Sequence, residues 1–156
     1  MSNDLNVRIV ELPPMRVASV LGFGAQPESL AWDKLMTWAE PRGLLKSQPA
    51  PRIFGFNNPS PTPGNPNYGY EFWITVSPEV TSDDSATVRD FPGGLYAVTR
   101  CQGVDTISST WQQLVAWLET SPYKSARHQW LEEHITSTPD LNPEALVLDL
   151  YMPVKE

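Results

Sequence analysis

The chain has 156 residues, and 40% of them are apolar, which suits one domain or one domain built from two similar halves. Its single cysteine, Cys101, excludes an internal disulfide bond. The two histidines, His128 and His134, have no cysteine nearby, so we expect no metal site. The sequence has neither a phosphate loop nor a dinucleotide glycine fingerprint, so we also expect no cofactor. The net charge of -7 disfavours direct binding to nucleic acid, whose phosphates are neutralised by Lys and Arg.

The amino-terminal stretch "MSNDLNVRIVEL" lacks the basic start and apolar run of an export signal. The sequence also holds no apolar run of about eighteen residues, the length that a membrane-spanning helix needs. We therefore expect a cytoplasmic protein without membrane contact.

Hydrophobic periodicity predicts an α+β fold, with helices packed on one face of a largely antiparallel sheet. A breaker-rich loop, "PSPTPGNPN", separates two of the strands. In chain order the expected elements are a strand over 7–12, the strand "MRVASVLGFG", a helix around "AWDKLMTWAEPRGLL", the strands "RIFGFNN" and "YGYEFWITV", the strand "GLYAVTRCQG", a helix around "TWQQLVAWLETSPY", a second helix around "SARHQWLEEHI", the loop "TSTPDLNP" and the strand "ALVLDLYMPV".

An internal repeat divides the chain into two modules. Each module has a strand that ends in glycine and a helix that carries the spacing W-x-x-L-x-x-W. The repeat predicts a duplicated unit, with module one at about 5–78 and module two at about 86–156. We expect the segment between them, "SPEVTSDDSATVRDFPGG", to be a solvated linker. The repeated positions are Trp32, Leu35 and Trp38 in the first helix and Trp111, Leu114 and Trp117 in the second.

The strand "YGYEFWITV" carries the first candidate site. Alternation places Glu71, Trp73 and Thr75 on the face opposite the apolar set that begins at Tyr68. Two readings of Glu71 follow from this pattern. It is either an ordinary solvent-facing carboxylate or a buried group beside Trp73 that receives a cation or acts as a general acid and base.

The last strand offers the second candidate site, at Asp149 and Tyr151. Aligning "LYMP" with "ITVSP" through one gap makes these residues equivalent to Trp73 and Thr75, so we expect the two modules to present them in one groove. Trp130 either caps that groove or packs beneath the second helix.

The paired helices come in a particular order and spacing with the segments "PGGLYAVTRCQG", "WLETSPY" and "LDLYMPVKE". Through this order and spacing, nearly the whole chain resembles the GyrI-like small-molecule-binding domain. This resemblance implies two pseudo-symmetric strand-helix-strand-strand modules that form a curved antiparallel sheet, with helices on one face and a ligand groove on the other. It also implies an acidic residue flanked by aromatic residues in the groove, for which Glu71 with Trp73 is the best match. The same fold serves as the effector-binding half of some bacterial regulators.

Three functions remain open on this evidence. The first is a stand-alone protein that binds aromatic or cationic amphipathic molecules through Glu71, Trp73, Tyr151, Trp130 and Asp149. The second is a hydrolase, similar to relatives that open cyclopropyl rings, in which Glu71 adds water to an electrophile. The third is an interaction with a protein partner, such as gyrase inhibition, or with a second copy of the chain.

Overall fold

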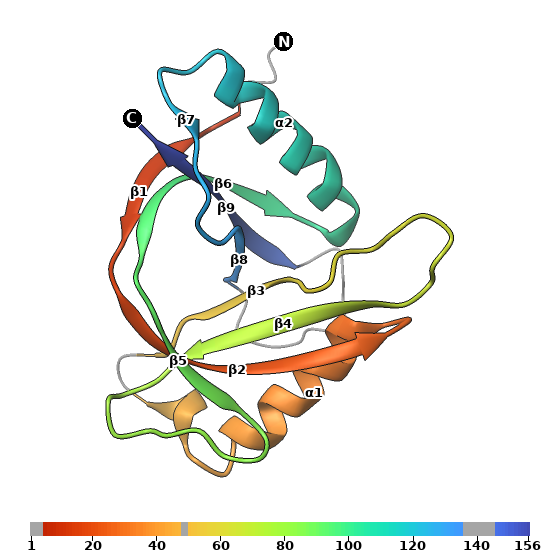
Figure 1. The fold of residues 1–156 in the computed structure, drawn as a ribbon, viewed down its shortest axis with the longest axis vertical. Coiled ribbons are helices and arrows are strands. Elements are labelled where there is room, and N and C mark those ends of the chain that lie inside the picture. Colours follow the sequence, from red (N-terminus) through yellow and green to blue (C-terminus); the bar gives the residue numbers. More distant parts are fainter. Residues whose placement is uncertain (1–4, 48–49, 136–145) are drawn as a thin grey trace. The chain divides into compact units, whose positions relative to one another are not determined.

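A computed structural model describes residues 5–47, 50–135 and 146–156. The chain forms two compact units, each an antiparallel sheet with one α-helix (Figure 1). Unit 1 comprises Met1–Pro14 and Pro92–Glu156, and unit 2 comprises Met15–Phe91. The expected α+β class is therefore confirmed.

Unit 2 is a four-stranded sheet in the order β5-β2-β4-β3, and α1 packs on one of its faces (Figure 1). Its core joins alternate residues of β2 and β4, such as Val20 and Phe72, to Trp32, Leu35 and Trp38 of the helix. The elements are β2 (Met15–Gly24), α1 (Pro27–Ala39), the 3-10 turn η1 (Leu44–Lys46), β3 (Ile53–Asn57), β4 (Tyr68–Thr75) and β5 (Thr87–Phe91).

Unit 1 repeats this plan in the order β1-β6-β9-β8, with the short strand β7 also paired to β9. Its core joins Ala97 and Cys101 of β6 and Leu150 of β9 to Leu114 of α2. The elements are β1 (Arg8–Leu12), β6 (Gly94–Gln102), the 3-10 turn η2 (Val104–Thr106), α2 (Ile107–Glu119), β7 (Lys124–Ser125), β8 (Leu131–His134) and β9 (Val147–Lys155).

The two strand orders match position by position, which confirms the duplication. In each unit the strand before the helix pairs with the last strand of the repeat and, on its other side, with an added strand. The central leucines of the two W-x-x-L-x-x-W helices, Leu35 and Leu114, are both 0% exposed. The repeated spacing therefore records the same packing requirement twice.

Gly22 shows why helix α1 can lie so close to its sheet. A Cβ atom at this position would lie 2.6 Å from the carbonyl oxygen of Pro27 and 2.7 Å from the nitrogen of Ala31. Only glycine leaves room for the first turn of the helix there. Proline at the first helical position and Glu28 in the first turn then favour starting the helix at this point.

Two expectations about individual elements are wrong. The second helix expected around "SARHQWLEEHI" is absent, because this segment holds the end of β7 and strand β8, and Leu131–His134 pairs in antiparallel register with β9. The presumed linker contains strand β5, which pairs with Met15–Ser19 of β2. Strand β1, expected at the start of module one, pairs with β6 of unit 1. The expected loop "TSTPDLNP" lies outside the described residues.

Candidate functional sites

Glu71 and Trp73 lie on the face of unit 2 that is opposite helix α1. Their cross-strand neighbours in β3 are Phe56 and Phe54, and paired residues of a sheet share one face. Both side chains are buried, at 4% exposed for Glu71 and 5% for Trp73. The reading of Glu71 as an ordinary solvent-facing carboxylate is therefore wrong.

The buried Glu71 carboxylate is held by donors from three strands and one loop. The Ser19 hydroxyl donates to Oε2 at 2.5 Å, and the Trp73 indole N–H donates to the same atom at 2.8 Å. Asn58 Nδ2 donates to Oε1 at 3.0 Å, and Arg89 Nη2 lies 3.8 Å from Oε2. These contacts offset the cost of burying a charge, and they fix the orientation of the carboxylate.

Trp73 is fixed at both ends. While its N–H is bound to Glu71, its ring packs edge to face on Phe56, with centroids 5.1 Å apart, and at a tilt on Phe91, 5.3 Å away. Such ring pairs add to the stability gained from burial alone. Unit 2 thus presents a rigid aromatic cluster around one carboxylate.

The sheet registers correct the expected correspondence between the two candidate sites. Asp149 occupies the position of Glu71, and Tyr151 the position of Trp73, rather than those of Trp73 and Thr75. The one-gap alignment was displaced by two residues. The register pairs that show this are Leu21 with Glu71 and Arg100 with Asp149, then Ser19 with Trp73 and Val98 with Tyr151.

Asp149 is neutralised by two arginines of its own unit. Arg100 donates from Nε to Oδ1 at 2.8 Å and from Nη2 to Oδ2 at 3.1 Å. Arg8 Nη2 donates to Oδ2 at 2.9 Å. Hydrogen bonding to Asp149 raises the pKa of Arg100 above its ordinary value. A carboxylate that already faces two guanidinium groups is a poor receptor for a further cation.

Tyr151 is hydrogen-bonded to Glu133, a carboxylate that is not among the predicted site residues. Its hydroxyl donates to Glu133 Oε1 at 2.7 Å, and Glu133 is only 9% exposed. The Tyr151 ring packs edge to face on Tyr96, which in turn packs on His128, with centroid separations of 5.4 and 4.8 Å. Burial raises the pKa of Tyr96 well above its ordinary value, so its hydroxyl stays protonated.

The sequence pattern did not indicate Glu133, because it predicts a helix over this segment. As a strand, the same segment places Leu131 and Glu133 on one face, opposite Tyr151 and Asp149 of β9. Trp130, just before this strand, packs against helix α2, with its ring 5.4 Å from that of Trp111.

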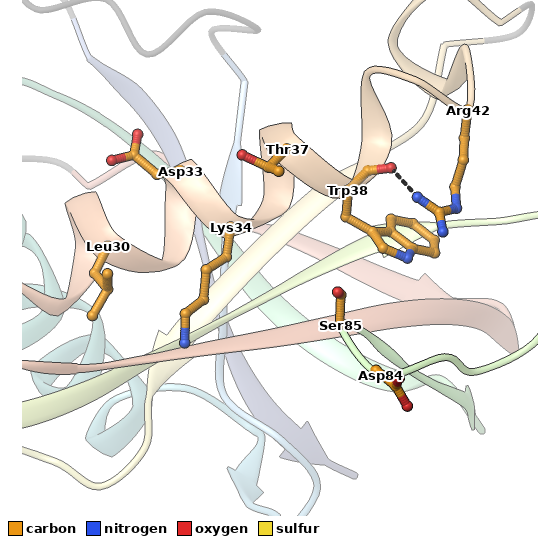
Figure 2. A pocket seen from close by; sticks show the side chains of 8 residues that line it. All are labelled: Leu30, Asp33, Lys34, Thr37, Trp38, Arg42, Asp84 and Ser85. Atoms are coloured by element: carbon orange, nitrogen blue, oxygen red, sulfur yellow. Dashed lines mark hydrogen bonds between the residues drawn. The ribbon is translucent and has the colours of Figure 1, made fainter.

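A pocket of about 480 Å³ lies along the outer side of helix α1 in unit 2 (Figure 2). Its wall on the loop side is fixed by Asp83, which accepts hydrogen bonds from Trp38 Nε1 at 2.8 Å and from Arg42 Nη2 at 2.6 Å. None of the predicted site residues lines it. The lining residues are Leu30, Asp33, Lys34, Thr37, Trp38, Arg42, Asp84 and Ser85.

Within the described ranges, no group of three or more His, Cys, Asp or Glu side chains could hold a metal ion. Burial lowers the pKa of His134 to about 4 and raises the pKa of the Cys101 thiol. In the same ranges, no helix has the length and apolar character to cross a membrane.

Comparison with known proteins agrees with this geometry. Residues 8–154 match the model of the Cass2 family, described as integron-associated effector binding protein. A hydrolase from Listeria innocua superposes with a TM-score of 0.71 at 14% identity, covering 99% of this chain and 94% of that one. The EcmrR C-terminal domain gives 0.68 at 16% identity, with 97% and 98% covered.

A third structure was solved with a ligand in place. SAV2435 bound to tetraphenylphosphonium superposes with a TM-score of 0.56 at 12% identity, covering 97% of this chain and 94% of that one. At these identities the solved structures establish a shared fold. Together with the family match they confirm the resemblance to the GyrI-like domain.

Proposed function

Because this chain belongs to the Cass2 family of integron-associated effector binding proteins, we propose that it is a binding protein for organic cations that carry aromatic groups. The observation that carries the proposal is a buried carboxylate set beside aromatic rings on the face of the sheet away from the helix. Such a pair attracts a cation through its charge and through the ring faces. The tetraphenylphosphonium bound to SAV2435 is a ligand of this class.

The first anchor that we propose is Glu133 with Tyr151. The carboxylate accepts a hydrogen bond from the Tyr151 hydroxyl, and the Tyr151 ring packs on the Tyr96 ring within the same unit. The hydrogen bond fixes the carboxylate, so little entropy is lost when a cation arrives. Ring edges and faces supply the apolar contacts that an aryl group needs.

Glu71 with Trp73 is the second anchor. Here the carboxylate already lies 3.8 Å from the Arg89 guanidinium, and it accepts hydrogen bonds from Ser19, Asn58 and Trp73. A ligand would have to share this charge with Arg89, whose side chain is largely exposed. Glu133 likewise lies within the field of a guanidinium, since its charge, after the larger effect of Asp149, helps to raise the pKa of Arg100, so the variants below decide between the two pairs.

The test is calorimetric titration of the full chain with tetraphenylphosphonium, and with tetraphenylborate as an anion of the same shape. We expect the cation to bind and the anion not to bind. Glu133→Gln should weaken binding about tenfold or more, which corresponds to about 1.4 kcal/mol, because the variant keeps the shape and loses the charge.

The matched control is Glu119→Gln, at an exposed position near the end of α2. It should leave the affinity unchanged. A tenfold loss in Glu71→Gln with no loss in Glu133→Gln would move the anchor to unit 2. Equal binding of the two ions, or full affinity in both carboxylate variants, would contradict the proposal.

The alternative function is hydrolysis of a strained electrophile in the same place. It is favoured by the structural similarity to the hydrolase from Listeria innocua. A carboxylate beside a bound electrophile could activate water as a general base. Mass spectrometry of a cyclopropane-bearing compound after incubation separates the two functions, since a binder returns it intact and a hydrolase returns it with one water added.

A further inference from the structure

Strand β2 has an outer edge that is only half paired. On one side it pairs with β4 over residues 17–24, whereas on the other side β5 pairs only with Met15–Ser19. Among the strands that the structure describes, none pairs with the outer edge at residues 20–24. Unpaired strand edges of this kind are templates for the addition of another strand.

The chain before β5 leaves this edge because hydrogen bonds to Asp83 hold it beside helix α1. If β5 began two residues earlier, Ser85 would lie opposite Leu21 in the register that pairs Ser19 with Thr87. Instead, Asp83 accepts hydrogen bonds from Trp38 and Arg42, and Ser85 lines the pocket below Trp38 (Figure 2).

One backbone acceptor on this edge is already occupied. Lys34 reaches from α1 toward β2 (Figure 2), and its Nζ donates to the carbonyl oxygen of Leu21 at 2.9 Å. In an antiparallel ladder the N–H and C=O groups of one residue point to the same side, and those of the residue two positions on point there too. The backbone groups of Phe23 therefore face the same outer edge as those of Leu21.

The side chains along the edge are apolar and exposed. Leu21 is 45% exposed and Phe23 53% exposed, and both lie on the sheet face away from α1. The segment from Val20 to Gly24, "VLGFG", carries no charge. A strand that adds here would meet no charged group on the segment itself.

We propose that the outer edge of β2 at residues 20–24 pairs antiparallel with the same edge of a second copy, and that Lys34 limits this pairing by occupying the Leu21 carbonyl. Antiparallel pairing of identical strands creates a two-fold interface, in which each copy uses the same patch. With Leu21 opposite Phe23 of the other copy, the exposed apolar side chains cover one another. The segment itself adds no like charges at the two-fold axis, whereas the Lys34 ammonium groups of the two copies approach one another there, which is a second way in which Lys34 limits the pairing.

The test is sedimentation velocity of the full chain over a range of concentrations, without ligand, so that it does not depend on the proposed function. We expect Lys34→Met to strengthen dimer formation about tenfold, as freeing one acceptor restores one backbone hydrogen bond in each copy. Lys46→Met, at another exposed lysine of unit 2, is the matched control and should behave as wild type.

A second variant shows whether the same edge is responsible. Phe23→Glu added to Lys34→Met places two carboxylates in the interface and should return the protein to the wild-type sedimentation profile. In the Lys34→Met dimer, hydrogen exchange at the Leu21 and Phe23 amides should slow with rising protein concentration. Unchanged sedimentation of Lys34→Met, or a dimer that tolerates Phe23→Glu without slower exchange at these amides, would overturn the proposal.

Discussion

At the scale of single residues, the two units stabilise an equivalent buried carboxylate with different partners. Glu71 and Asp149 occupy equivalent positions in β4 and β9, and both are buried. Glu71 is bound mainly by neutral donors such as Ser19, whereas Asp149 is paired with the guanidinium of Arg100. The fold therefore requires partners for an acid at this position, and each half of the chain has supplied its own.

Asp83 is the residue for which we predict an effect of pH. Hydrogen bonding from Trp38, followed by the backbone N–H groups of Ser85 and Ala86 and the charge of Arg42, holds its pKa below the ordinary 3.8. A carboxylate with a lowered pKa stabilises the fold above its unfolded pKa, and this stability is lost as pH falls through the folded pKa. Stability should therefore fall as pH drops below about 4.

The measurement is the thermal midpoint of Asp83→Asn between pH 7 and pH 2.5. The variant should be less stable at neutral pH and should lose part of the acid-induced decline. Asp84→Asn, the neighbouring exposed carboxylate in the same loop, is the control and should follow wild type. Matching curves for Asp83→Asn and wild type would refute the role assigned to this carboxylate.

The sequence indicated which strand carries a candidate site but not what surrounds it. Alternation along one strand was enough to set Glu71 and Trp73 apart from the core residues. Ser19, Asn58 and Arg89 reach Glu71 only through cross-strand register and loop geometry. No local pattern encodes such contacts between segments that are far apart in the chain.

At the scale of elements, the two helices depend on their central leucines. Leu35 and Leu114 are fully buried in their respective cores. Replacing either by Ala removes apolar contacts and leaves a cavity, so each variant should lose about 2 to 5 kcal/mol of unfolding free energy. Urea denaturation followed by circular dichroism measures this loss.

The control for this pair is Val115→Ala, next to Leu114 on helix α2 but 43% exposed. It should change the unfolding free energy by no more than about 0.5 kcal/mol. A similar cost for the exposed and buried positions would mean that the helix does not pack through its central leucine.

Helices were easier to predict than short strands, for a physical reason. The helices carry an apolar stripe with local spacing that is visible in any window of the sequence. Strand β5 lies in a stretch with Asp83, Asp84 and Asp90 that looked like a solvated linker, and β8 resembled a helix. Both are strands because a neighbouring strand supplies their hydrogen bonds, which is a tertiary effect.

At the scale of the whole molecule, the duplication gives each half its own core. Leu35 belongs to the cluster around α1, and Leu114 to the cluster around α2. Because the described members of these two clusters do not overlap, the double variant Leu35→Ala/Leu114→Ala should lose the sum of the single losses to within about 0.5 kcal/mol. A larger deviation in the same urea measurement would show that the two cores are coupled.

The strand order also determines the sequence of events during synthesis on the ribosome. Unit 2 is inserted into unit 1, and its first and last residues, Met15 and Phe91, lie opposite each other in one strand pair. All strands of unit 2 have therefore been made once Phe91 has been added. Strand β1 is synthesised first, yet its partner β6 follows the whole of unit 2. During synthesis β1 therefore stays without its partner β6 until all of unit 2 has been made, and unit 1 can form only after that.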